Sequence, residues 1–188
     1  MAEHGRRTAG GAPPRTPWRV GPIACTGWDT IVFIEFFNAD PASPWFVSAR
    51  SLLAAAKKGR FQICTSVLAI TEVAYVKPLE YLGKRFVGGH EEELDRMWLD
   101  YPTVLTVRCD DHIARTARDM LRWAMRKQIR LVQNPDLVHI ATAMFLKAGQ
   151  IHTTDKNWFL YSEYAGIPIG YPEAPAPEPK LFPEAASD

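Results

Sequence analysis

The chain is poor in cysteine, has no long apolar run and carries almost no excess of charge of one sign. Its three cysteines, Cys25, Cys64 and Cys109, are an odd set without a Cys-x-x-Cys pair, which argues against a disulfide framework and a cysteine zinc site. No stretch approaches the roughly 20 apolar residues of a membrane-spanning helix, and no apolar segment follows the basic N-terminus as in a secretion signal. We therefore expect a cytoplasmic protein in a reducing compartment, without a membrane as partner.

The near balance of charge excludes two further classes of protein. The 22 Lys and Arg face 21 Asp and Glu, so the chain is neither a polybasic nucleic-acid-binding tail nor a highly charged disordered protein. Any contact with a polyanion must come from bases that cluster locally. With 188 residues, 47% of them hydrophobic, the chain can bury the core of one compact domain.

Proline is scarce in the middle of the chain and concentrated at its ends. Nine of the 15 prolines fall in residues 1–22 or 172–188, where periodic apolar residues are also few. This composition predicts a flexible basic tail over 1–22, a folded domain over 23–171 and a Pro-rich acidic tail over 172–188.

Short apolar runs alternate with longer helical periods between the two tails, which is typical of βα units around a parallel sheet. The pattern predicts strands over 23–28, 61–64, 103–107, 151–154 and 167–169, and helices over 31–37, 45–58, 66–76, 91–100, 110–127, 135–147 and 156–164. Ser66 is predicted to cap the third helix and Pro135 to open the sixth, while Gly59 and Gly149 are predicted to end helices. Ligands of such α/β folds bind at the carboxyl ends of the strands.

Four carboxylates interrupt apolar contexts at positions that this architecture uses for ligands. Asp29 ends the first predicted strand, and Asp155 follows the fourth. Glu72 is the only charge in the helix predicted over 66–76, and Asp136 lies in the first turn of the helix that Pro135 opens.

Each carboxylate taken singly also has a purely structural explanation. Asp136 is favoured by the dipole at a helix N-terminus, and Asp155 and Asp29 can cap the helices that follow them. Glu72 can be the one solvent-facing position of a mostly buried helix. An unpaired carboxylate in an apolar helix is costly, so Glu72 is the hardest of the four to explain by structure alone.

Together, the four carboxylates favour a metal site. Three of them would meet at one edge of a parallel sheet, and the helix of Glu72 starts at that edge. Carboxylates this close repel one another unless hard cations neutralise them, and ligation by oxygen alone suits Mg²⁺ or Mn²⁺. Such sites activate water and orient phosphodiesters, so the pattern predicts a metal-dependent phosphodiesterase.

The order of these motifs resembles the PIN domain family. Asp29-Thr30 stands before an apolar helix, and Thr65-Ser66 is followed by Thr71-Glu72-Val73. Residues 135–143, which run Pro-Asp-Leu-Val-His-Ile-Ala-Thr-Ala, and then Thr153-Thr154-Asp155 complete the series. The likeness extends over about 23–169, nearly the whole predicted domain.

The resemblance implies a three-layer α/β/α sandwich around a short parallel β-sheet, and a Mg²⁺- or Mn²⁺-dependent endoribonuclease whose products end in a 5′-phosphate and a 3′-hydroxyl. Carried over position by position, Asp29, Glu72, Asp136 and Asp155 match the family's metal-binding and catalytic acids, and Thr154 matches a hydroxyl residue near the scissile phosphate. Small free-standing members are commonly VapC-type toxins of type II toxin-antitoxin pairs, which implies a cognate antitoxin and a homodimer.

Two departures from the family pattern bear on these expectations. The position two after the first Asp is often a small polar residue in the family but is Ile31 here, which removes one hydrogen bond near the metal ligands. The chain is also longer than many toxin members, through its tails and residues 78–101. A housekeeping RNA-processing nuclease and a non-catalytic PIN-like interaction module are therefore the alternatives.

An RNA substrate requires positive charge around the acidic residues. Arg115, Arg118 and Arg122 recur at helical spacing, together with Arg126, opposite the apolar stripe of the helix predicted over 110–127, and the first three are predicted to bind substrate. The alternative is a solvated helix face. Two neighbours of the acids complete the prediction: a core His139 on the helix face of Asp136, and Trp158, the one tryptophan close enough to the site to be tested.

Overall fold

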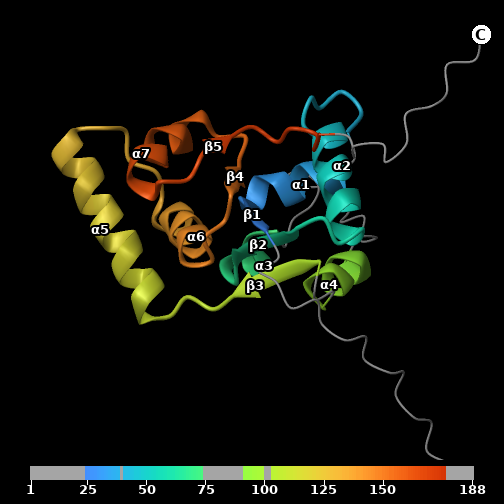
Figure 1. Cartoon of the computed structure of the whole chain (residues 1–188), viewed down its shortest axis with the longest axis horizontal. Coiled ribbons are helices and arrows are strands. Elements are labelled where there is room, and N and C mark those ends of the chain that lie inside the picture. Colours follow the sequence, from blue (N-terminus) through green and yellow to red (C-terminus); the bar gives the residue numbers. More distant parts are fainter. Residues whose placement is uncertain (1–23, 39, 74–90, 100–102, 177–188) are drawn as a thin grey trace, which may run out of the picture.

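A five-stranded parallel β-sheet forms the centre of the protein, whose computed structural model describes residues 24–38, 40–73, 91–99 and 103–176 (Figure 1). In chain order the strands are β1 (Cys25–Trp28), β2 (Gln62–Ser66), β3 (Val104–Val107), β4 (Gln150–His152) and β5 (Ile169–Gly170). They lie in the order β3-β2-β1-β4-β5, and every neighbouring pair is parallel. All carboxyl ends therefore meet at one edge of the sheet.

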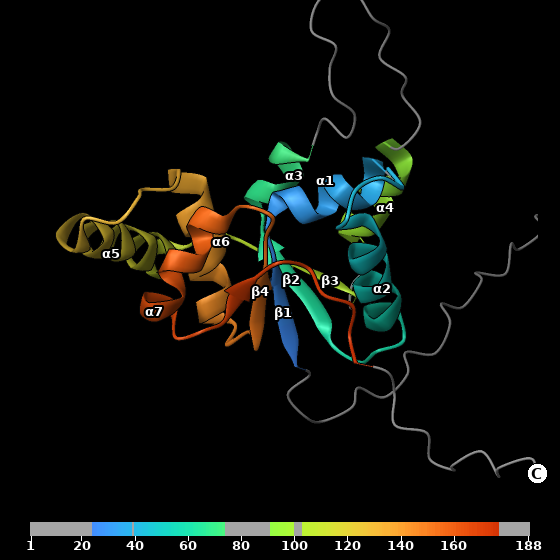
Figure 2. The same ribbon diagram turned by 90° about the horizontal axis from the view of Figure 1, so that it is seen from above.

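Helices cover both faces of this sheet (Figure 2). One layer holds α1 (Thr30–Asn38), α2 (Phe46–Lys57) and α4 (Glu91–Leu99), and the opposite layer holds α5 (Asp111–Lys127), α6 (Asn134–Phe145), the 3₁₀ helix η1 (Lys156–Tyr161) and α7 (Ser162–Ala165). The short α3 (Leu68–Glu72) follows β2 at the carboxyl edge. The predicted three-layer α/β/α sandwich is thereby confirmed.

Two hydrophobic clusters fill the spaces between the sheet and its two helical layers. The cluster under α1, α2 and α4 contains Trp28, Phe33 and Ile63, whereas the cluster under α5 and α6 contains Cys64 and Ile140. Ile63 and Cys64 are successive residues of β2 and belong to different clusters because side chains alternate between the two faces of a strand. A sheet buried on both faces explains why its strands are short apolar runs rather than alternating patterns.

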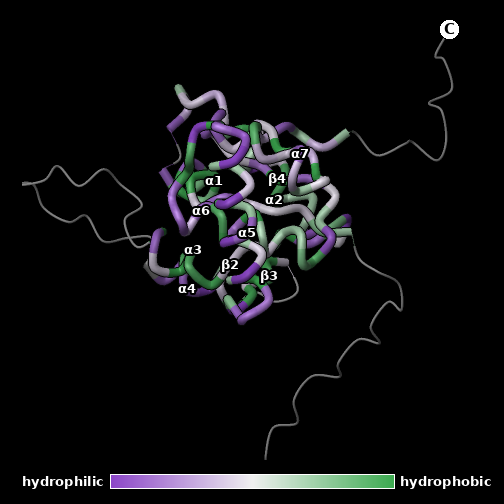
Figure 3. The backbone as a smooth tube through the Cα atoms, turned by 90° about the vertical axis from the view of Figure 1, so that its left-hand side faces the viewer, coloured by the Kyte–Doolittle hydropathy of each residue, from purple (hydrophilic) through white to green (hydrophobic). Residues whose placement is uncertain are grey.

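The helix α5 shows the amphipathic pattern that the sequence predicts. Asp110 caps it, since its side chain accepts a hydrogen bond of 2.9 Å from the amide of Ile113. Of the predicted apolar stripe, Leu121 is half-buried and the other members are buried, namely Ile113, Ala117, Met120 and Ala124. From the α5 side of the molecule, hydrophilic and hydrophobic segments alternate along the backbone (Figure 3).

The predicted cap at Ser66 is wrong. Ser66 is the last residue of β2, because it still pairs with Val107 of β3, and α3 begins only at Leu68. The hydroxyl of Ser66 nevertheless accepts a hydrogen bond of 3.1 Å from the amide of Leu68. The helix ends at Glu72, and residues 74–76 of the predicted helix lie outside the described residues.

Two other helices differ from their predictions, one in where it ends and one in its type. α6 ends at Phe145, and the chain reverses at Lys147, whose φ of 53° is left-handed, so Gly149 does not end the helix. The helix predicted over 156–164 is a 3₁₀ helix as far as Tyr161. The tails predicted over 1–22 and beyond 176, and much of residues 78–101, lie outside the described residues.

No helix in the described part of the chain has both the length and the apolar character needed to cross a membrane.

Candidate functional site

All four predicted carboxylates line one open cavity at the carboxyl edge of the sheet. Its volume is about 420 Å³. The lining residues are Asp29, Thr30, Ile31, Ile34, Glu72, Gln133, Asp136, Thr154, Asp155 and Trp158. They come from the ends of β1 and β4 and from α1, α3, the start of α6 and η1, since parallel strands bring their carboxyl ends together.

Asp29 is the buried carboxylate of the four, with 7% of its surface exposed. The hydroxyl of Thr153 donates a hydrogen bond of 2.6 Å to Asp29 Oδ2, and the amide of Asp29 donates to the carbonyl of His152 at 3.0 Å. Burial raises the pKa of Asp29 to about 6, although the hydrogen bond from Thr153 opposes this. A positive charge placed near Asp29 would therefore stabilise its ionised form.

Asp136 and Asp155 both accept hydrogen bonds from backbone amides at helix starts. Asp155 is the N-cap of η1, as its structural explanation predicts, whereas Asp136 lies in the first turn of α6, where the helix dipole was predicted to favour it. Asp136 Oδ2 accepts a hydrogen bond of 2.9 Å from the amide of Gln133, within a capping box at the start of α6. Asp155 Oδ1 accepts one of 2.9 Å from the amide of Asn157. Burial raises the pKa of Asp136 despite this bond. Each cap uses one carboxylate oxygen, which leaves the second oxygen for a further ligand.

Glu72 is held by two side chains from other elements. Its Oε2 accepts hydrogen bonds from the hydroxyl of Thr30 and from His139 Nε2, the latter at 2.9 Å. Burial by itself raises the pKa of Glu72, but the hydrogen bonds from His139 and Thr30 outweigh it and hold the pKa below its ordinary value. Glu72 is therefore not merely a solvent-facing position of its helix.

The hydroxyl side chains around the acids are the part of the site that sequence reasoning missed. Thr30 and Thr153 donate to Glu72 and Asp29, and Thr65 contacts His139. Each stands next to a strand end or an acidic residue in the quoted motifs, which is the signal that could have identified it. Thr154, the hydroxyl residue singled out from the sequence, lines the cavity.

The donor chemistry of the cavity fits a hard divalent cation. Among the described residues, no Lys or Arg forms an ion pair with any of the four carboxylates. Within the same residues, however, no three His, Cys, Asp or Glu side chains come close enough together to hold an ion jointly. Mg²⁺ commonly takes one or two protein carboxylates and keeps several waters, so a site rich in water fits these residues.

The predicted substrate-binding arginines lie outside the cavity. Arg115, Arg118 and Arg122 are on the exposed side of α5, which forms the outer edge of its layer (Figure 1). Arg115 pairs with Asp111 at 2.8 Å, and the other two lie 3.4 Å and 3.7 Å from Asp119. The structure thus describes a solvated, internally paired helix face, and a role of these arginines in binding RNA stays a prediction.

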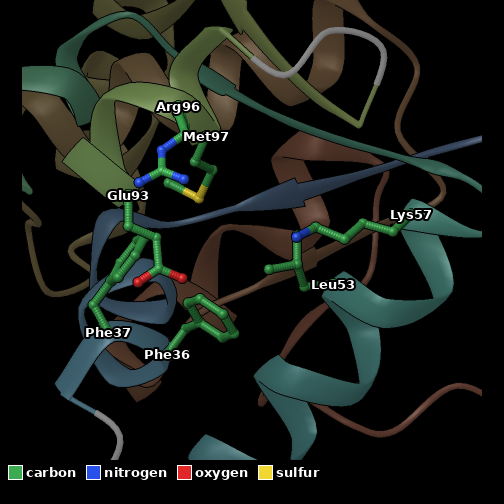
Figure 4. A pocket seen from close by; sticks show the side chains of 7 residues that line it. All are labelled: Phe36, Phe37, Leu53, Lys57, Glu93, Arg96 and Met97. Atoms are coloured by element: carbon green, nitrogen blue, oxygen red, sulfur yellow. The ribbon is translucent and has the colours of Figure 1, made fainter. Parts of the chain in front are cut away.

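A second cavity, of about 430 Å³, lies between α1, α2 and α4 (Figure 4). Its lining residues are Phe36, Phe37, Leu53, Lys57, Glu93, Arg96 and Met97. None of the acids predicted from the sequence contributes to it, so the chemistry of the candidate site is confined to the first cavity.

Comparison with known proteins supports the fold. Neither a protein-family model nor a curated protein matches the chain. A solved structure, described as the crystal structure of FitAcB from Neisseria gonorrhoeae, matches with a TM-score of 0.52 and 15% sequence identity, over 79% of this chain and 97% of that chain. Likeness at this identity concerns the fold alone. Together with the parallel sheet and its two helical layers, it identifies the architecture as PIN-like.

Proposed function

We propose that the protein is a Mg²⁺- or Mn²⁺-dependent endoribonuclease that hydrolyses RNA phosphodiester bonds in the cavity at the carboxyl edge of the sheet. One observation carries the proposal: Asp29, Glu72, Asp136 and Asp155, from four separate segments, line a single open cavity of a PIN-like fold. In the part of the chain that the structure describes, these buried and half-buried carboxylates have no Lys or Arg partner. Such carboxylates are costly, and a divalent cation is the partner that would offset the cost.

Each carboxylate has a distinct proposed role. Asp29 and Asp136 would hold the main cation, and Asp155 would bind it through water or hold a second ion. A bound cation supplies positive charge for the phosphate and lowers the pKa of water. Glu72 holds a water or accepts the proton of the attacking one, and Thr154 places a hydroxyl beside the scissile phosphate.

Cleavage of RNA by purified protein freed of metal, with and without added Mn²⁺, tests this proposal. We expect Asp136→Asn to lower metal-dependent cleavage by more than about 100-fold, because it removes a charge that holds the cation. Asp95→Asn is the matched control, since Asp95 is an exposed acid of α4 outside the cavity. Full activity of Asp136→Asn, or equal loss in both variants, would contradict the assignment.

The finer proposal is that this nuclease is the toxin of a type II toxin-antitoxin pair, with a cognate antitoxin and a homodimeric state. It rests on the sequence resemblance to small free-standing PIN proteins. Expression of the chain alone should arrest growth, and co-expression of a small protein from an adjoining reading frame should relieve the arrest. Growth unaffected by an active enzyme would favour a housekeeping RNA-processing nuclease instead.

A non-catalytic PIN-like interaction module is the second candidate. Two observations favour it: Ile31 lines the cavity where the family often has a small polar residue, and the described acids form no ready group of three metal ligands. The cleavage experiment separates the two candidates, because a module of this kind would bind RNA or protein without metal-dependent hydrolysis.

A further inference from the structure

Glu72 stands on an element that is too short to orient it. α3 has five residues, Glu72 is the last of them, and the helix closes with a hydrogen bond of 2.9 Å from the amide of Val73 to the carbonyl of Ala69. One turn of helix has little stability of its own. The direction of the Glu72 carboxylate therefore depends on what its side chain contacts.

His139 is the best-held of those contacts. It lies in the middle of the twelve-residue α6, is 4% exposed, and its ring stacks near Trp158, with 6.4 Å between the ring centroids and 25° between the planes. Its Nδ1 lies 3.2 Å from the hydroxyl oxygen of Thr65, a residue of β2 that is 2% exposed. The ring is thus fixed on one face by Trp158 and at one nitrogen by the sheet.

Within the described residues, the second ring nitrogen meets only hydrogen-bond acceptors. Nε2 lies 2.9 Å from Glu72 Oε2 and 3.2 Å from the hydroxyl oxygen of Thr30, and that hydroxyl already donates its proton to Glu72. Nε2 must therefore carry a hydrogen and donate it. The hydroxyl of Thr65 can donate its proton either to Nδ1 of His139 or to the carbonyl of Trp28, which lies 2.9 Å away. In both arrangements Nε2 keeps its hydrogen and donates it to Glu72, so the orientation of Glu72 does not depend on which of them Thr65 adopts.

We infer that His139 is a positioning residue, which orients the Glu72 carboxylate at the cavity through Nε2 and is itself anchored through Nδ1 by Thr65. The inference rests on the proposed function, in which Glu72 handles a water at the metal site. Replacing a residue that holds a metal ligand in place commonly lowers metal affinity or activity by about 10- to 100-fold. His139 thus transmits the rigidity of α6 and β2 to the end of α3.

Two neutral variants separate the two ring nitrogens. In His139→Gln the amide nitrogen occupies a place close to that of Nε2 and can still donate to Glu72, whereas in His139→Asn the shorter amide reaches only the place of Nδ1. We expect His139→Gln to keep Mn²⁺ affinity and kcat within about threefold of the wild type. We expect His139→Asn to lose about 10- to 100-fold in both, with KM for RNA unchanged.

Mn²⁺ affinity is measured by titration calorimetry, independently of cleavage, and thermal unfolding shows that each variant is folded. Equal Mn²⁺ affinity and kcat in His139→Gln and His139→Asn would overturn the inference, because a hydrogen-bond donor at the place of Nε2 would then make no difference. If His139→Asn fails to fold, Thr65→Val replaces it: removal of the anchor should lower Mn²⁺ affinity about tenfold, and wild-type affinity in folded Thr65→Val would overturn the inference.

An imidazole signal in the metal-free protein distinguishes this inference from the proposed function. A protected Nε2 proton should appear in ¹H–¹⁵N spectra and shift in Glu72→Gln, because a charged acceptor becomes neutral. An Nε2 proton signal with the same chemical shift in the wild type and in Glu72→Gln would contradict the positioning role. Wild-type protein that shows the signal and the Gln/Asn difference in Mn²⁺ affinity, but cleaves no RNA, would support His139 as the positioning residue and reject the nuclease.

Discussion

At the scale of single residues, Asp29 carries the largest electrostatic cost among the candidate site residues. It is 7% exposed, and its burial raises the pKa to about 6 from an ordinary value of 3.8. In the unfolded chain the carboxyl group ionises near its ordinary pKa. The folded state therefore binds the proton more tightly than the unfolded state, and protonation of Asp29 favours folding. This contribution to stability is complete below about pH 4 and is lost as the pH rises through about 6.

Asp29→Asn should therefore stabilise the metal-free protein at pH 8. A pKa difference of about two units corresponds to about 3 kcal/mol, and the gain should be smaller because asparagine offers one acceptor oxygen instead of two. The gain should shrink as the pH is lowered toward 4.5, where the aspartic acid is itself protonated. Thermal unfolding in EDTA at both pH values measures it. A variant less stable than the wild type at pH 8 would contradict the electrostatic cost.

At the scale of elements, α6 organises the candidate site. It begins with the capping box that contains Asp136, carries His139 in its middle and packs on β1 and β2. Its close approach to β1 depends on Gly27, since a Cβ at that position would lie 2.9 Å from Ala143 Cβ and 3.1 Å from Ile151 Cγ1. Glycine at this crossing is therefore a packing requirement rather than a requirement of backbone conformation.

We expect Gly27→Ala to lower the free energy of unfolding by about 1–3 kcal/mol, because α6 or β4 must shift to admit the methyl group. Gly170→Ala is the matched control in another strand of the same sheet, where an added Cβ meets nothing within 4 Å. Urea unfolding compares the two variants. Equal stability of Gly27→Ala and Gly170→Ala would show that α6 adapts without cost.

At the scale of the whole molecule, the acids and the predicted RNA-binding arginines are separated. The cavity is lined by residues of the carboxyl edge, whereas Arg115, Arg118 and Arg122 project from α5 and lie beside Asp111 or Asp119. An RNA that used both regions would need to extend beyond the cavity. The arginines can therefore affect the binding of long RNA without affecting the chemical step.

Replacing Arg115, Arg118 and Arg122 with Gln tests this arrangement. We expect an unchanged cleavage rate for a short oligonucleotide and weaker binding of a long single-stranded RNA. The slope of log affinity against log salt should fall by about 0.7 for each phosphate that the protein no longer neutralises. A control variant, in which three other exposed basic residues are replaced with Gln, removes the same charge elsewhere on the surface. These residues are Arg50, Lys58 and Lys147. Identical binding by the two triple variants would assign α5 a solvated face and no role in holding RNA.

Much of the fold was predictable because it depends on local pattern. The apolar runs before Asp29 and Asp155 and the periodicity of α5 placed strands and helices close to their observed bounds. Helix ends were less predictable, since they depend on competing partners. Ser66 continues β2 because Val107 of β3 is there to pair with it, and that pairing is not encoded near Ser66.

The sequence by itself determined which carboxylates stand at strand ends and helix starts, because those positions follow from the spacing of apolar residues along the chain. Only the tertiary structure decided how they are held. His139 lies 67 residues from Glu72 and 74 from Thr65, so their contacts exist only once α6 has packed against β2 and α3. Short-range pattern records which side of an element faces the core, whereas hydrogen bonds between distant side chains depend on the packing of whole elements.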